Sequence, residues 1–278
     1  MAFGANEKRV VLITGVSSGI GEAAAIALSA RGNLVIGTTK EFDRTTHLSQ
    51  YGIQQVEMDL RDAQSVSRAI ELMLQVGVPD VIIHNAGFGC YGMAEDLPRR
   101  AMEEQFAANV FGAQQINHAL VPAMRARGSG RIVFVSSVLG VVAMKGRGLY
   151  VASKYALEGL ADTMRLELWG SGVDVVIIEP GPIATHFRQS ALEALQRFVD
   201  PSQGGDKVFY ERFVAGLAAE RSSNRFALPA TACLPSLFAA IEAPRPKARY
   251  AVTVPARLFP LLKRVLPTRL LDFVLRRG

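Results

Sequence analysis

Short apolar runs alternate along the chain with longer segments of helical periodicity. The first run, residues 9–14 (RVVLIT), is followed by a helical pattern from about Gly19 to Arg31 and then by a second run at 34–39 (LVIGTT). The runs are rich in valine and isoleucine and lack polar alternation, which is typical of strands covered by helices on both faces. Further strands are predicted at 54–59, 80–85, 131–137, 173–179 and 249–254, and further helices at about 60–74, 99–126 and 148–169.

Strands that alternate with helices in this way imply right-handed crossovers and a doubly wound parallel sheet, so the expected fold class is α/β. A polar interruption at 200–207 (DPSQGGDK) is interpreted as a loop tip within an insertion, not as a linker between domains. We therefore expect one domain over residues 1–278. Its core would span about 8–187, a helical lid about 186–230, and a basic tail about 256–278.

Composition indicates a compact globular chain, with 49% apolar and 20% charged residues. The chain has 31 lysines and arginines against 25 aspartates and glutamates, and many of the extra positive charges lie near its end, which does not favour nucleic-acid binding. Cys90 and Cys233 show no metal-ligand spacing, so we expect a reducing compartment and no metal site. With only four consecutive apolar residues at 10–13 and no run of ~20, a cytoplasmic protein is expected.

A glycine-rich turn follows the first strand. In TGVSSGIG (14–21), Gly15, Gly19 and Gly21 fall where the strand leads into the helix. Glycine there permits a tight turn and lets backbone N–H groups approach a pyrophosphate at the helix N-terminus. The spacing G-x3-G-x-G differs from the dinucleotide-binding fingerprint G-x-G-x-x-G. We predict a dinucleotide site because the glycine-rich turn lies directly after the first strand.

The end of the second strand bears on the choice of dinucleotide. An NAD site places an acid there for the ribose 2′-hydroxyl, whereas the 2′-phosphate of NADP requires a cation. The strand ends Thr38-Thr39-Lys40, with no acid before Glu41. Lys40 therefore favours NADP, and a solvated lysine beside Glu41 is the alternative that leaves NAD open.

The predicted helix GLYVASKYALEGL (148–160) carries two tyrosines around one lysine. Positions i and i+4 share a helix face, so Lys154 can act on Tyr150, whereas Tyr155 points elsewhere and is interpreted as a packing residue. Carbonyl reduction by a nicotinamide requires a hydride and a proton. We expect the ammonium group and a positive nicotinamide to lower the pKa of Tyr150 from ~10, which makes Tyr150 the proposed proton donor.

Two further polar residues are candidates for the same chemistry. Ser137 ends the strand 131–137 and can donate to a substrate carbonyl oxygen, unless it only caps the backbone. Asn109 stands among apolar neighbours in the predicted helix 99–126, where a buried amide needs partners. This placement supports a functional role for Asn109.

These motifs together resemble the short-chain dehydrogenase/reductase family over roughly residues 8–187. The residues that carry the resemblance are TGVSSGIG, Asp59-Leu60, HNAG (84–87), Asn109, Ser137, YVASK (150–154) and PGPIAT (180–185), in the family's order. His84 departs from the family's usual second asparagine and is interpreted as a hydrogen-bonding residue at the strand end. The resemblance implies a single Rossmann-like domain, an oxidoreductase acting on CH–OH or C=O groups, and a homodimer or homotetramer.

Within the family, the segments 108–113 (ANVFGA), 150–162 (YVASKYALEGLAD) and 244–254 (PRPKARYAVTV) look like one branch, and the runs 85–92 (NAGFGCYG) and 261–267 (LLKRVLP) look closest to its bacterial members. That branch holds 17β-hydroxysteroid and retinol dehydrogenases and bacterial NADP-dependent aldehyde reductases. The resemblance implies the catalytic set Asn109, Ser137, Tyr150 and Lys154, in which Lys154 also binds the nicotinamide ribose and Asn109 holds a water. The implied cofactor-binding residues are Gly15, Ser17, Ser18, Gly19, Ile20, Gly21, Thr39, Lys40, Asp59, Leu60, Asn85, Ala86, Gly87, Tyr150, Lys154, Pro180, Gly181, Ile183 and Thr185.

The lid segment carries large apolar side chains at roughly helical spacing, which predicts amphipathic helices. An apolar inner face suits a medium- or long-chain aldehyde, a retinoid or a steroid. His186 is interpreted as a loop residue. The candidate substrate-pocket residues are Cys90, Tyr91, Leu139 and Phe187.

The tail combines leucines with six basic residues and one acid, Asp272, and we expect Pro260 and Pro267 to break it into short helices. It packs against the lid or a second subunit, or it lies on an anionic membrane surface. The leading hypothesis is an NADP(H)-dependent oxidoreductase that reduces an apolar aldehyde or ketone. The alternatives are a hydroxysteroid- or retinol-type dehydrogenase, a non-catalytic NADP-binding redox sensor, and a membrane-surface interaction protein.

Overall fold

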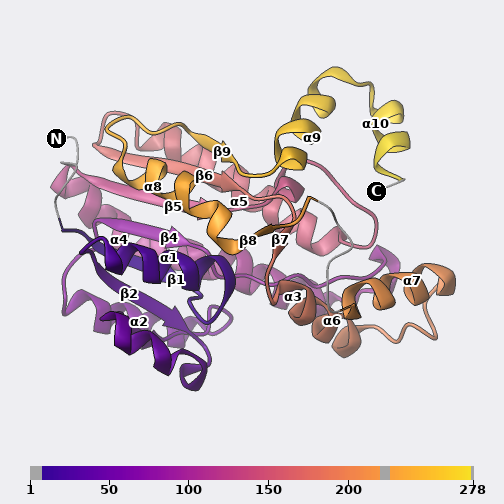
Figure 1. The fold of residues 1–278 in the computed structure, drawn as a ribbon, viewed down its shortest axis with the longest axis horizontal. Coiled ribbons are helices and arrows are strands. Elements are labelled where there is room, and N and C mark those ends of the chain that lie inside the picture. The colour runs from indigo at the N-terminus through magenta and orange to yellow at the C-terminus, as the bar shows by residue number, and fades with distance from the viewer. Residues whose placement is uncertain (1–7, 220–225, 277–278) are drawn as a thin grey trace.

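Seven parallel strands form the central sheet of the protein, which we describe from a computed structural model over residues 8–219 and 226–276 (Figure 1). The strand order is β3-β2-β1-β4-β5-β6-β9, which confirms the doubly wound α/β fold. The chain builds outward from β1 in one direction and from β4 in the other, so the order reverses between these two strands. The strands are β1 (Val10–Thr14), β2 (Leu34–Thr39), β3 (Gln54–Glu57), β4 (Val81–His84), β5 (Gly130–Val135), β6 (Val173–Glu179) and β9 (Arg249–Ala251).

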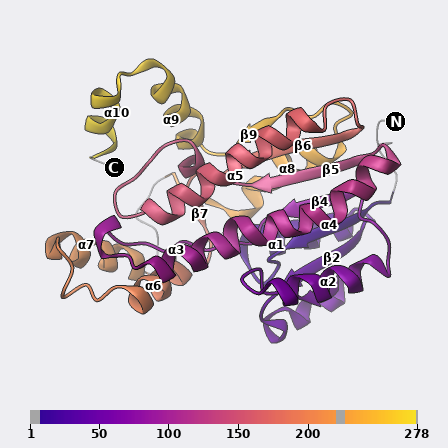
Figure 2. The same ribbon diagram turned by 180° about the vertical axis from the view of Figure 1, so that it is seen from behind.

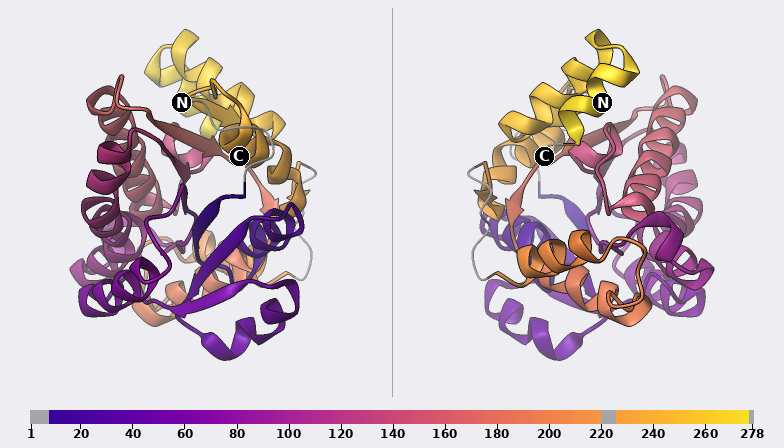
Figure 3. Two further views of the ribbon diagram at one scale, coloured as in Figure 1. Left: turned by 90° about the vertical axis from the view of Figure 1, so that its left-hand side faces the viewer. Right: turned by 90° about the vertical axis from the view of Figure 1, so that its right-hand side faces the viewer.

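Helices cover both faces of the sheet (Figures 2 and 3). On one face, Ile82 and Phe134 pack with α2, α4 and α5; on the other, Ile83 and Val133 pack with α1 and α8. Neighbouring strand residues point to opposite faces, and both faces are buried, which explains the apolar runs without alternation. These elements are α1 (Gly19–Ala30), α2 (Ala63–Leu74), α4 (Gly112–Arg127), α5 (Gly148–Glu167) and α8 (Leu234–Glu242), with 3-10 segments η1 (Phe42–Tyr51) and η5 (Ala230–Cys233).

The lid and the tail lie beyond the carboxyl ends of the strands (Figure 1). We use "lid" for α6 (Phe187–Phe198) and α7 (Lys207–Ala218), which the loop before Lys207 separates. Lid residues Leu195 and Tyr210 join Tyr150 and Ala256 in a third apolar cluster. Residues 220–225 of the expected lid and 277–278 of the expected tail lie outside the described residues. The short strands β7 (Ile183–Ala184) and β8 (Leu228–Pro229) pair at the two ends of the insertion.

The structure corrects two element boundaries. The predicted helix 99–126 consists of α3 (Arg99–Phe106), a π-helical turn η3 (Ala107–Phe111) and α4. The predicted strand 249–254 ends at residue 251, because the Thr253 side chain caps the next helix by accepting from the N–H of Ala256 at 3.3 Å.

Pro260 does not break the tail. It lies inside α9 (Val254–Val265), where its missing N–H costs one hydrogen bond of the helix. Pro267 does separate α9 from α10 (Thr268–Leu275). In the tail, Ala256, Phe259 and Leu275 pack against the lid cluster. Within residues 8–219 and 226–276, no helix combines the length and the apolar character needed to cross a membrane.

Candidate active site

A cleft of about 790 Å³ opens at the carboxyl ends of the strands. It lies where the strand order reverses between β1 and β4, which is where open α/β sheets bind ligands. Each of the predicted cofactor-binding residues except Gly21 lines the cleft, and so do Ser137, Tyr91, Leu139 and Phe187. Cys90 and Asn109 do not line it.

The glycine loop has the backbone that the motif requires. Gly15 and Gly19 have φ angles of 72° and 65°, in the left-handed region that favours glycine. Gly21 serves packing instead: a Cβ there would lie 2.1 Å from the Gly15 carbonyl oxygen and 2.4 Å from Asn85 Nδ2. The glycine at position 21 therefore lets α1 approach the loop, rather than lining the cleft.

The glycine loop is tied to the loop that follows β4. Thr14 Oγ1 accepts from the backbone N–H groups of Asn85 and Ala86, both at 3.0 Å. Asn85 Nδ2 donates to the carbonyl oxygens of Thr14 (3.0 Å) and Gly15 (2.9 Å). Asn85 thus holds two walls of the cleft together. Thr14 was not predicted from the sequence, although its place directly before Gly15 is a usable signal.

A rim of cations lines the cleft beyond β2 and β3. Lys40 lies 3.2 Å from Glu41, and Arg44 lies 2.7 Å from the same carboxylate. Arg61 pairs with Asp59 at 2.5 Å, and these hydrogen bonds hold the pKa of Asp59 below its ordinary value. Arg44 and Arg61 also line the cleft and were not predicted, because neither belongs to a motif.

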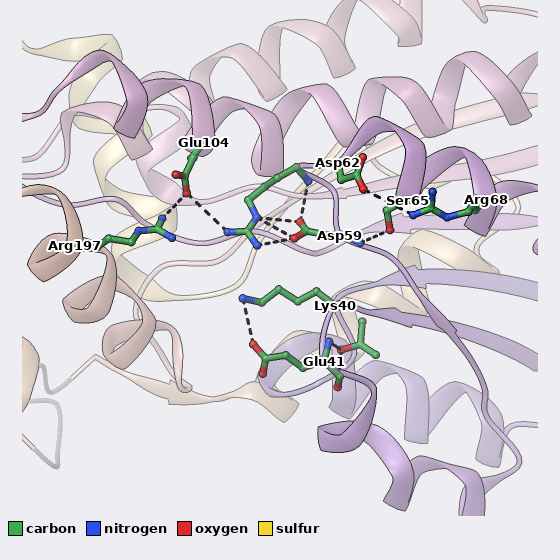
Figure 4. Close-up of polar contacts among 10 residues, drawn as sticks. Lys40, Glu41, Asp59, Asp62, Ser65, Arg68, Glu104 and Arg197 are labelled. Atoms are coloured by element: carbon green, nitrogen blue, oxygen red, sulfur yellow. Dashed lines mark hydrogen bonds and ion pairs between the residues drawn. The ribbon is translucent and has the colours of Figure 1, made fainter.

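An ionic chain connects this rim to the lid (Figure 4). Glu104 of α3 accepts from Arg197 of α6 at 2.5 Å and lies 3.8 Å from Arg61, which in turn holds Asp59. At its other end, α6 begins with Phe187, whose ring centre is 5.3 Å from that of Tyr150. Helix α6 therefore contacts the core at both of its ends.

Tyr150, Lys154 and Ser137 meet in the middle of the cleft. Lys154 Nζ lies 5.8 Å from the centre of the Tyr150 ring and donates to the Val135 carbonyl oxygen at 2.9 Å. Ser137 Oγ accepts from the N–H of Leu139 at 3.1 Å and lies beside the Tyr150 hydroxyl. Tyr155 points away: its hydroxyl donates to the Val141 carbonyl and lies 2.9 Å from Lys263 Nζ in the tail.

In this structure the pKa of Tyr150 is shifted upward, and the lowering expected beside Lys154 and a positive nicotinamide stays a prediction. Burial raises the pKa of the phenol, Tyr91 adds to this, and Ser137 and Arg147 only partly oppose it. Burial also lowers the pKa of Lys154 to about 8, against the effect of Glu158. The Lys154 ammonium is directed to a backbone carbonyl, and desolvation dominates at the phenol. Tyr150 is therefore a protonated donor here.

Asn109 lies on the π-helical turn behind the cleft. Its Oδ1 accepts from the N–H of Phe88 at 3.1 Å, and its Nδ2 donates to the Phe88 carbonyl (3.1 Å) and to Ser153 Oγ (3.0 Å). Turns of this kind are frequent at functional sites. Asn109 fixes the loop after β4 against the catalytic helix α5, and its water-holding role stays a prediction.

Aromatic residues form the substrate side. The Tyr91 ring centre lies 6.0 Å from that of Tyr150, and Phe213 of the lid lies 5.9 Å from Tyr91. Cys90 is a wrong prediction: it is fully buried, its N–H donates to Gln105 at 2.6 Å, and burial raises the pKa of its thiol to about 11. Phe213, Met144 and Arg147 line the cleft but were not predicted as pocket residues.

His84 lies in the core beside the cleft. Its Nε2 is 2.7 Å from Asn117 Oδ1, its ring stacks on Phe134, and burial lowers its pKa to about 4. The imidazole is therefore neutral and bonded at the strand end, as the sequence suggested.

A buried ionic cluster lies behind the catalytic helix. Arg249, the first residue of β9, donates to Glu158 and Asp162 of α5 and to Glu179 at the end of β6. The side chains of Glu158 and Glu179 are only 7% and 8% exposed. This cluster joins the last strand of the sheet to α5, one turn after Lys154.

Comparison with known proteins assigns the family. The sequence model described as "short chain dehydrogenase" matches residues 9–196. The chain is 39% identical to "Uncharacterized oxidoreductase YbbO" of Escherichia coli (strain K12), covering 97% of this chain and 94% of that protein. It is 33% identical to human "17-beta-hydroxysteroid dehydrogenase type 1", covering 92% and 80% of the two chains.

Two further similarities bear on the site. The chain is 30% identical to the "NADPH-dependent 3-dehydrocapnine reductase" of Ornithobacterium rhinotracheale, covering 95% of each. The crystal structure of a short-chain dehydrogenase from Streptomyces avermitilis superposes with a TM-score of 0.75 at 27% identity, covering 96% of this chain and 94% of that chain. With the cleft, the glycine loop and the Tyr150–Lys154 pair, these similarities place the chain in the short-chain dehydrogenase/reductase family of nicotinamide-dependent oxidoreductases.

Proposed function

We propose that the protein is an NADP(H)-dependent oxidoreductase that transfers a hydride between the nicotinamide and an apolar aldehyde or ketone, or the corresponding alcohol. The main support for this proposal is that Tyr150 is buried and protonated beside Ser137. Both residues lie in a cleft whose walls include Tyr91, Phe187 and Phe213. A dinucleotide fits the residues present, because Gly15 and Gly19 adopt the left-handed backbone of a tight turn, and α1 begins at Gly19 without a side-chain cap from Ser18, so its N-terminus can accept a pyrophosphate. When bound, the nicotinamide supplies the hydride.

In this proposal each catalytic side chain has a separate task. Ser137 Oγ donates to the carbonyl oxygen and stabilises the charge that develops there. Tyr150 gives its phenolic proton to that oxygen, and the Lys154 ammonium stabilises the phenolate left behind while it binds the nicotinamide ribose. Asn109 positions α5 through Ser153. In the oxidation direction Tyr150 takes the proton back.

Replacing Lys40 by alanine is expected to lower kcat/KM for NADPH about tenfold and to change that for NADH much less, because a 2′-phosphate is held by cations. Lys40, Arg44 and Arg61 all line this part of the cleft, and one relative is named as NADPH-dependent. Steady-state kinetics with both cofactors measures the ratio of kcat/KM for NADPH to kcat/KM for NADH. Arg68→Ala, on α2 outside the cleft, is the control that should change neither. Equal losses with both cofactors would contradict NADP specificity.

Carbonyl reduction is expected to weaken as the pH rises through about 8. Burial lowers the pKa of Lys154 to about 8, so its ammonium loses its proton over this range. Tyr150 stays protonated there, because burial raises its pKa. The profile of kcat/KM for the carbonyl between pH 6 and 10 at saturating NADPH measures this. A flat profile through pH 9 would exclude Lys154 as the titrating group.

One assay tests the proposed function against its alternatives. The protein is mixed with NADPH and aldehydes of increasing chain length, beside retinal and a 17-ketosteroid, and the absorbance of NADPH is followed. Consumption with the ketosteroid or retinal alone favours the dehydrogenase alternative suggested by the relatives. Tight NADPH binding without consumption of any carbonyl favours a redox sensor, although a sensor has no use for Tyr150.

We also infer that the protein is cytoplasmic and touches anionic membranes through its tail. Val254, Leu258, Leu261 and Val265 follow one face of α9, and the last two are 57% and 70% exposed. The basic residues on the same helix are Arg257, Lys263 and Arg264, and the ammonium of Lys263 contacts Tyr155 and Val141. An apolar face bordered by cations fits an anionic lipid surface, whereas a second copy of the same face would meet like charge.

Replacing Leu261 and Val265 by serine is expected to reduce binding to anionic vesicles about tenfold, since both apolar side chains would leave the bilayer. Flotation with phosphatidylglycerol vesicles, and with phosphatidylcholine vesicles for comparison, measures it. Leu72→Ser removes a comparably exposed leucine from α2 and should leave binding to the vesicles unchanged. A wild-type chain that does not float with anionic vesicles would overturn the membrane contact.

A homo-oligomer is proposed on the resemblance to the family. Its support in the structure is the exposed apolar side chains of Phe111, Leu166 and Trp169 on the helical layer formed by α4 and α5. Sedimentation velocity of the full chain measures the oligomeric state. A monomer at micromolar concentration would contradict the proposed homo-oligomer.

A further inference from the structure

Arg147 lies inside the cleft, three residues before Tyr150. It is partly buried and lines the cleft together with Tyr91, Phe213 and Tyr150. Its guanidinium carbon is 5.3 Å from the centre of the Tyr91 ring and 5.5 Å from that of Phe213. Because Tyr91 also contacts the Tyr150 ring, the guanidinium and the proposed proton donor share one aromatic neighbour.

In the part of the chain that the structure describes, Arg147 has no carboxylate partner, whereas the nearby Lys145 and Arg197 each have one. Lys145 pairs with Asp206 at 2.9 Å, and Arg197 pairs with Glu104 at 2.5 Å. Across residues 8–219 and 226–276, Arg147 forms no ion pair, and its neighbours are the two rings and the Tyr91 hydroxyl. Aromatic faces offset only part of the cost of removing a guanidinium from water.

A guanidinium in this setting is a receptor for an anion. It offers five N–H donors in a planar array that matches carboxylate, sulfonate and phosphate groups, and such pairs are strongest where water is excluded. The apolar walls from Phe187 and Phe213 favour a hydrocarbon chain at the same time. The cleft thus combines one charged and one apolar subsite beside Tyr150.

We propose that the substrate is amphiphilic: a carbonyl compound with an apolar chain and an anionic group near the carbonyl, which Arg147 binds. This inference rests on the proposed function and narrows its substrate class. The anionic group lies against Arg147 while the carbonyl oxygen meets Tyr150 and Ser137. The chain extends between Phe187 and Phe213 under the lid.

Matched pairs of substrates test the proposal. Butanal, 4-octanone and 4-decanone are compared with 4-oxobutanoate, 4-oxooctanoate and 4-oxodecanoate, in which the carboxylate stays near the carbonyl, using wild type, Arg147→Met and Arg147→Lys. We expect wild type to prefer the anion in at least one pair. Arg147→Met should lower the anion-to-neutral ratio of kcat/KM about 30-fold, mainly through KM, since it removes a charge-assisted pair. Arg147→Lys should restore part of the ratio.

The controls separate this inference from the proposed function. Reduction of the uncharged carbonyl compounds by wild type tests the function alone. The matching alcohols and hydroxyalkanoates are titrated by calorimetry, so that anion preference is measured without turnover. Arg99→Met removes an exposed arginine that pairs with Glu103 far from the cleft and should leave the ratio unchanged. Wild type without anion preference in either assay, or equal losses for both partners of every pair in Arg147→Met, would overturn the proposal.

Discussion

Replacing Tyr150 by phenylalanine is expected to lower kcat for carbonyl reduction about a thousandfold while leaving NADPH affinity nearly unchanged. The substitution keeps the ring contacts with Tyr91 and Phe187 and removes only the hydroxyl that gives the proton. General acid catalysis typically contributes 10²–10⁴-fold to a rate, and the Tyr150 hydroxyl is the proposed acid. Stopped-flow turnover and NADPH fluorescence measure the two quantities separately.

Tyr155→Phe is the matched control, because it removes the same atom from the same helix on its outer side. The Tyr155 hydroxyl contacts Val141 and Lys263, and neither contact reaches the cleft. Turnover should stay within about twofold of wild type, as for other surface substitutions. If Tyr150→Phe were to retain wild-type kcat, the proton would have to come from another group, and Ser137 would be the first to examine.

Replacing Arg249 by methionine is expected to destabilise the fold by about 3–5 kcal/mol, which is typical of breaking a buried ion pair from one side. The change leaves Glu158 and Glu179 buried without their cation, although their side chains are only 7% and 8% exposed. Denaturant unfolding of the full chain, followed by circular dichroism, measures the loss in the free energy of unfolding.

The loss should also depend on pH in a defined direction. Burial raises the pKa of Glu158 above its ordinary value, and removing Arg249 raises it further. An acid with a raised pKa destabilises the folded state above its unfolded pKa, and this cost is relieved as protonation sets in. Arg249→Met should therefore lower the free energy of unfolding less at pH 5 than at pH 8. Arg165→Met, which breaks a partly exposed pair with Asp162, should cost less than about 1 kcal/mol at both pH values.

Local patterns predicted the sheet and the centre of the site well. The strands around Ile82 and Val133 are apolar because both faces are covered, and this leaves a signal of three consecutive apolar residues at 81–83 and four at 132–135. The glycine loop and the pair Tyr150–Lys154 were equally readable, because a turn and an i, i+4 spacing are fixed by neighbouring residues. Such features need no knowledge of distant segments.

Features that depend on distant segments were missed. Glu104 and Arg197 are 93 positions apart, and only the folded lid brings them together. Cys90 follows the motif residues closely, yet its orientation is set by Gln105 on another element. Burial in the surrounding apolar cluster raises the pKa of Tyr150, and no local pattern in the sequence showed this effect.

The position of Arg249 also sets an order of events during synthesis. β9 pairs with β6 through only three residues, and about 70 residues of lid and connecting chain separate the two strands. At roughly 5–20 residues per second, the ribosome needs about 4–14 s to bridge that interval. Until then β6 is an unpaired edge of the nascent sheet, and Glu158 and Glu179 lack their ion-pair partner Arg249. Nascent chains stalled before residue 249 should therefore be the ones that holding chaperones retain.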